Sequence, residues 1–144
     1  MKKLALVCVA IAVIAGAWFL FQPKGQSLSA AQTSPLADGA MVAVVVPAQF
    51  TEQEQMGERA YEAKCAACHG ANGQGQDGVA PPFVHRIYEP NHHGDMAFVL
   101  ATQNGVRAHH WSFGDMPAVE GVTVSDVSNI VAYVRALQRE NGIN

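Results

Sequence analysis

The sequence predicts an all-α domain at residues 50–144, preceded by a transmembrane helix at residues 1–21 and a linker at residues 22–49. Three observations support this prediction: an uncharged N-terminal run, apolar residues spaced three and four apart further along, and no alternating strand pattern in the domain. The chain has 144 residues, which is the length of one domain.

The N-terminal apolar run covers residues 4–21 and follows Lys2 and Lys3. A spanning helix needs roughly 20 apolar residues, whereas a signal peptide has about 7–15. The run therefore favours an uncleaved anchor, and a signal cleaved near Leu28-Ser29-Ala30 is the alternative. Because flanking lysines stay in the cytoplasm, we expect the domain in the periplasm, held at the bacterial inner membrane or, after cleavage, soluble.

The linker at residues 22–49 is rich in Gln, Ser, Ala, Pro and Gly, which is typical of a tether. Its exception is the apolar, β-branched segment 40–46. An exposed segment of this kind would promote aggregation, so we expect it to pack against the domain. Addition of a partner chain is the alternative.

The first helix of the domain is predicted over residues 52–63. Thr51 is a good N-cap, and Glu54 completes a capping box. Gly57 costs up to about 1 kcal/mol relative to Ala inside a helix, so we expect another helix to approach closely there. The residues on or beside the apolar face are Met56, Gly57, Ala60, Tyr61 and Ala63.

Two further helices are predicted. One spans residues 95–104 and ends at Gly105. The last begins at a Thr123 or Ser125 cap and ends at Gly142. Its apolar residues have helical spacing and are Val127, Ile130, Val131, Val134 and Leu137.

The cysteines indicate the cofactor. Cys65-Ala66-Ala67-Cys68-His69 is the pattern of c-type haem attachment, in which two thiols add to the vinyl groups and His69 ligates the iron. A thioredoxin-like dithiol is the alternative, but such a motif should follow a strand. A zinc site of four thiolates is excluded, because the third cysteine, Cys8, lies in the apolar run.

Four glycines between the motif and Pro81 permit tight turns close to a flat cofactor. A carbonyl in the proline segment can accept a hydrogen bond from Nδ1–H of His69, which fixes the tautomer and raises the basicity of the ligand. We assign this carbonyl to Pro81, with Pro82 next. A plain surface loop is the alternative.

An electron-transfer haem needs a sixth iron ligand, for which Met116 is the best methionine. A thioether raises the potential, and Pro117 keeps Met116 extended. The remaining methionines beyond the apolar run precede the motif or lie in a predicted helix: Met41, Met56 and Met96. The rival is the pair His109-His110, which would lower the potential.

Residues 51–140 resemble a class I cytochrome c domain. The matching segments occur in the order of that family: 56–61, 65–70, 80–83, 114–117 and 125–140. The resemblance implies one covalently bound haem c, six-coordinate iron and electron transfer. It also favours a crossing of the first and last helices at Gly57, with Tyr61 and Tyr133 nearby.

Two histidine pairs, His92-His93 and His109-His110, exceed what the family pattern requires. One reading is a second metal site or a contact with a copper-bearing partner, because imidazole suits copper, zinc and nickel. The other is hydrogen-bonding surface groups. We also expect one of Arg107, His109 and Trp111 to donate to a haem propionate.

The formal net charge is −3 over the chain, which argues against a nucleic-acid partner. Acidic side chains dominate residues 50–144, so we expect redox protein partners with a basic docking face. The sequence predicts an electron carrier or an electron-transfer subunit, not an enzyme, with no small-molecule substrate. The alternatives are a haem enzyme or sensor for peroxide or NO with a labile Met116, and a metal-handling protein.

Overall fold

The computed structural model describes residues 32–33 and 38–144. The predicted anchor at residues 1–21 lies outside the described residues, as do residues 22–31 and 34–37 of the predicted linker. Within the described ranges, no helix combines the length and the hydropathy that a membrane span needs.

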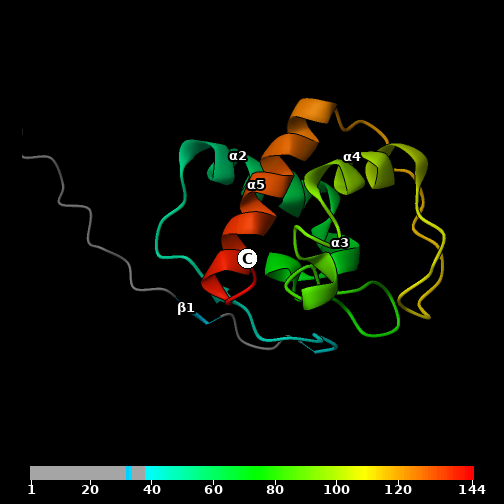
Figure 1. Ribbon diagram of the computed structural model, residues 1–144, viewed down its shortest axis with the longest axis horizontal. Coiled ribbons are helices and arrows are strands. Elements are labelled where there is room, and N and C mark those ends of the chain that lie inside the picture. Colours follow the sequence, from blue (N-terminus) through cyan, green and yellow to red (C-terminus); the bar gives the residue numbers. More distant parts are fainter. Residues whose placement is uncertain (1–31, 34–37) are drawn as a thin grey trace, which may run out of the picture.

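The described domain is mostly helical, in agreement with the predicted class. Besides α-helices, it contains short 3₁₀ turns at Ala71–Gly73 and Arg86–Tyr88. The α-helices are α2 (Glu52–Lys64), α3 (Ala66–His69), α4 (Asp95–Asn104) and α5 (Val124–Glu140). Figure 1 shows α5 running across α2, with α3 and α4 to one side of this pair.

Capping boxes start both long helices. Thr51 Oγ1 accepts a hydrogen bond from Glu54 N–H, and the Glu54 carboxylate accepts one from Thr51 N–H, as predicted. Thr123 and Asp126 form the equivalent pair, so Thr123 is the cap of α5. Each box satisfies two backbone groups that a helix start leaves unpaired.

The predicted crossing of the first and last helices is confirmed at Gly57. A Cβ atom on Gly57 would lie 1.9 Å from the carbonyl oxygen of Asn129 and 2.9 Å from Cβ of Tyr133. Tyr61 and Tyr133 are buried beside this contact, with ring centroids 5.5 Å apart. Glycine is therefore needed here because the two backbones approach closely.

The apolar segment 40–46 packs against the domain, as expected. Val44 is fully buried in the core. Asn141, just after α5, holds Val45 on both sides: its Oδ1 accepts from Val45 N–H at 2.9 Å, and its Nδ2 donates to Val45 O at 2.8 Å. Val45–Val46 (β2) also pairs with Gln32–Thr33 (β1) in an antiparallel ladder.

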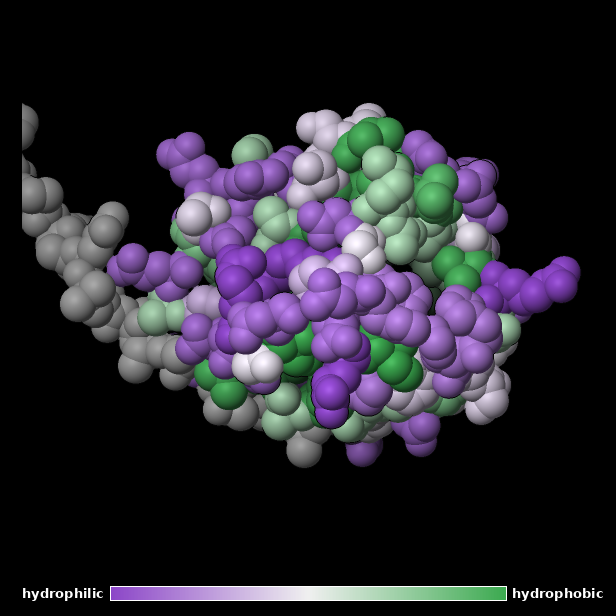
Figure 2. Space-filling view, viewed as in Figure 1, coloured by the Kyte–Doolittle hydropathy of each residue, from purple (hydrophilic) through white to green (hydrophobic). Residues whose placement is uncertain are grey.

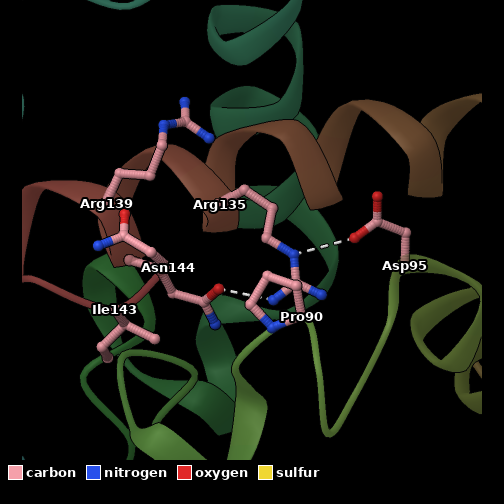
Figure 3. Close-up of a pocket in the computed structure, with 7 residues that line it drawn as sticks. Pro90, Asp95, Arg135, Arg139, Ile143 and Asn144 are labelled. Carbon is pink, nitrogen blue, oxygen red and sulfur yellow. Dashed lines mark hydrogen bonds and ion pairs between the residues drawn. The ribbon is translucent and has the colours of Figure 1, made fainter.

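Arg135 of α5 fastens the chain before α4 to the core. Arg135 is only 8% exposed, and its guanidinium donates to Tyr88 O and His93 O, each at 2.6 Å. It also binds Asp95 Oδ1 at 2.9 Å and Gln138 Oε1 at 2.6 Å. Figure 3 shows Arg135 reaching from α5 toward Asp95, along a shallow depression of about 340 Å³.

Candidate functional site

One helical turn carries both thiols and the imidazole of the motif. Cys65 ends α2 and also caps α3, because Cys65 N–H donates to Tyr61 O and Cys65 O accepts from His69 N–H at 2.9 Å. The buried Tyr61 donates through its hydroxyl to Gly70 O at 2.7 Å, at the other end of α3. Two hydrogen bonds of Tyr61, one through its backbone carbonyl and one through its hydroxyl, therefore hold the two ends of the turn that bears the motif.

The thiols are poorly suited to dithiol redox chemistry. Cys65 is half-buried and Cys68 is exposed, and both are free. Burial, and then the neighbouring Cys68, raise the pKa of the Cys65 thiol to about 11. A reactive dithiol needs a lowered pKa that yields the thiolate, so the thioredoxin-like alternative loses support. Two thiols that flank an imidazole are the donor set for covalent haem attachment.

His69 is buried in a fixed orientation. Its Nδ1–H donates to Pro81 O at 2.9 Å, the partner that the sequence predicted. Burial lowers the pKa of His69, and the bond to Pro81 opposes this effect. Because a carbonyl can only accept, Nδ1 carries the proton and Nε2 keeps the lone pair that an iron ligand needs.

Phe83 also orients His69, a role that the sequence pattern does not predict. The two rings are stacked, with centroids 4.1 Å apart and planes 21° from parallel. Phe83 N–H donates to Gly73 O at 2.8 Å, which draws the proline segment against the glycine-rich turn. The feature of the sequence that could have indicated this role is the aromatic residue two positions after Pro81.

The loop that bears Met116 is closed at its base. Val106 and Met116 exchange backbone hydrogen bonds of 2.8 and 2.9 Å directly after α4. Gly105 has φ +73°, and a Cβ atom there would lie 2.6 Å from Met116 O, so only glycine fits this approach. The half-buried Met116 therefore has a fixed backbone, while residues 107–115 form the rest of the loop.

Among the three residues that we expected to donate to a haem propionate, Trp111 offers a buried donor. Its Nε1 is buried without a hydrogen bond among the described residues. Burial raises the pKa of Tyr88 to about 12, and the nearby indole N–H of Trp111 opposes this rise. The indole N–H does not, however, have the geometry of a hydrogen bond to the Tyr88 hydroxyl. Arg107 and His109 are exposed instead, and Arg107 O accepts from His109 Nδ1–H at 2.9 Å.

The helix that leads into this loop carries exposed apolar side chains. Met96 and Leu100 are one turn apart on α4 and are 64% and 52% exposed. Figure 2 shows apolar surface, in green, in the region where Figure 1 places α4. The two thiols, the oriented imidazole, the buried indole donor and this apolar surface together fit a flat, apolar group with acidic edges.

The structure brings the two histidine pairs together. Nε2 atoms of His92 and His110 are 3.2 Å apart, and the ring centroids of His93 and His110 are 5.3 Å apart. The His109 ring lies 4.3 Å from that of His110. Loss of hydration, and then His109, His93 and His92, lower the pKa of His110.

The comparison with protein families gives one match. The family model described as Cytochrome c matches residues 54–138, which is more than half of the chain. No curated protein matches the sequence. The matched range includes the thiols, His69, the proline segment, Met116 and most of α5.

Proposed function

Since the chain belongs to the cytochrome c family and its cofactor is a covalently bound c-type haem, we propose that it shuttles electrons with His69 and Met116 as the axial ligands. When bound, the haem supplies reversible one-electron transfer at its iron. Cys65 and Cys68 would hold it by thioether bonds. The observation that carries this proposal is the buried His69, whose Nδ1–H is committed to Pro81 O.

Each residue of the site has a part that follows from its contacts. Pro81 and Phe83 keep Nε2 of His69 in one orientation and so limit reorganisation at the ligand. The base of the loop fixes the backbone of Met116, whose thioether would favour ferrous iron. The buried indole N–H of Trp111 would donate to a propionate.

The setting that we propose is the periplasmic side of a bacterial inner membrane. The uncharged run at residues 4–21 supports an anchor, and the lysines before it support a cytoplasmic N-terminus. The acidic domain would then meet redox proteins with basic docking faces, and these encounters would weaken as salt increases.

Replacing Met116 with alanine tests the ligand assignment. We expect the ferric protein to lose its far-red charge-transfer band, because that band reports methionine bound to iron. The midpoint potential should fall by on the order of 100 mV, a modest part of the roughly 0.8 V that axial ligands span. The measurements are a visible spectrum and a redox titration of the purified protein.

Met56→Ala is the matched control, because Met56 is 45% exposed on α2 and has no part in the proposed haem site. It should retain both the band and the potential. Unchanged spectra in Met116→Ala, with a change in a variant of His109 or His110, would show bis-histidine ligation instead. A high-spin ferric spectrum in the unmodified protein would favour the haem enzyme or sensor.

A further inference from the structure

Four of the histidines form two pairs that come from separate segments of the chain. His92 and His93 precede α4, whereas His109 and His110 lie in the loop that returns to Met116. The nearest ligand atoms of His92, His93 and His110 all lie within 4.8 Å of one another. Sequence neighbours rarely converge on one ion, but two pairs that face each other can.

We propose that His92, His93 and His110 bind one divalent transition-metal ion, for which Zn²⁺ and Cu²⁺ are the best-fitting cations. Imidazole nitrogen is a preferred ligand of both. With metal–nitrogen bonds of about 2.0–2.1 Å, two ligands of a tetrahedral ion are about 3.3 Å apart. The Nε2 atoms of His92 and His110 are already 3.2 Å apart.

Backbone contacts prepare the tautomers for metal binding. His93 Nδ1–H donates to Ile87 O at 2.6 Å, so its Nε2 keeps a lone pair. A metal-bound histidine commonly donates its other ring N–H to a backbone carbonyl in this way, which fixes the ring. His109 has the same arrangement, because its Nδ1–H donates to Arg107 O at 2.9 Å, and it lies beside the site.

The backbones that carry these rings are held in place from outside the cluster. Arg135 donates to His93 O, and Asp115 Oδ1 accepts from Ala108 N–H at 2.8 Å. Figure 3 shows the Arg135 side of this support, where the guanidinium also meets Asp95. The cluster therefore needs small side-chain rotations, and not a change of fold, to surround an ion.

A bound ion would join the chain before α4 to the loop that bears Met116. Three neutral imidazoles leave a fourth position for water or for His109, which is the open arrangement of many metal sites. An ion such as Mg²⁺ prefers oxygen ligands and should not bind here. This site uses none of the residues that we assign to the haem, so the proposed metal site and the proposed function can be tested independently of each other.

The test is a titration of the haem-loaded protein, purified without a polyhistidine tag, with Zn²⁺ and with Cu²⁺ by isothermal calorimetry. We expect one equivalent of either ion to bind and Mg²⁺ not to bind. His110→Asn should raise the dissociation constant at least about 10-fold, because it removes a ligand. His85→Asn is the matched control, since Asn can still accept from Ile87 N–H as His85 Nδ1 does, and it should bind as the unmodified protein does.

Two outcomes would overturn the proposal: no stoichiometric binding of either ion, or equal binding by the His110→Asn protein. In both cases the histidines would be surface groups that hydrogen-bond to one another. For Cu²⁺, an electron paramagnetic resonance spectrum gives a second readout. It should show coupling to several ligand nitrogens in the unmodified protein and fewer in His110→Asn.

Discussion

Replacing Gly57 with valine is expected to lower the free energy of unfolding by at least about 3 kcal/mol. Overpacking a core commonly costs about 1–3 kcal/mol when side chains can move aside. Here the added Cβ would lie 1.9 Å from a backbone oxygen, that of Asn129, so α2 and α5 would have to separate. Urea unfolding of the haem-loaded protein, followed by far-UV circular dichroism, measures the effect.

Ala63→Val is the matched control, because Ala63 lies on the exposed side of the same helix. It adds comparable bulk and should cost only the difference in helix propensity, at most about 0.7 kcal/mol. Similar destabilisation by both variants would mean that valine disfavours α2 by itself. The close crossing at Gly57 would then have no special role.

Replacing Arg135 with methionine is expected to destabilise the fold by about 2–4 kcal/mol, because neutral acceptors around its buried guanidinium would lose their donor. Methionine keeps much of the apolar stem but removes every donor. His93 O and Gln138 Oε1 would lose the hydrogen bonds that they accept from the guanidinium, whereas Tyr88 O would keep the one from Gln138 Nε2 at 3.0 Å. Each buried acceptor left without a donor costs about 1–3 kcal/mol. Thermal and urea unfolding give the magnitude.

Arg139→Met distinguishes this role from a general effect of lost charge. Arg139 also makes an ion pair, with Glu54 at 2.9 Å, but its side chain is 56% exposed. A pair of this kind contributes about 0–1 kcal/mol. If both variants lost the same stability, the buried network of Arg135 would contribute nothing beyond a surface ion pair.

The sequence predicted those features that depend on local chemistry. The capping box at Thr51 and the helix before Gly105 follow from side-chain and backbone preferences within a few residues. The partner of His69 was predictable because Nδ1 needs an acceptor and the proline segment supplies one. Gly57 was predictable as a contact because glycine is otherwise unfavourable inside a helix.

Features that depend on long-range geometry were not predictable. Met56 and Ala63 share a face with Ala60 but are exposed, because α5 crosses at Gly57 and covers the neighbouring face. Arg135 gives no local signal of burial, since the backbone carbonyls that it binds, those of Tyr88 and His93, lie more than forty positions away. The convergence of the histidine pairs likewise depends on how the loop after α4 folds back.

Covalent attachment at Cys65 and Cys68 is tested most directly by extraction with acidified acetone, applied to the full chain purified from cells that mature c-type haem. Thioether bonds predict that all pigment stays with the polypeptide, whose mass exceeds that of the bare chain by one haem. A Cys65→Ala, Cys68→Ala variant should release any pigment that it holds. Complete extraction from the unmodified chain, or a chain without pigment, would contradict covalent haem at this site.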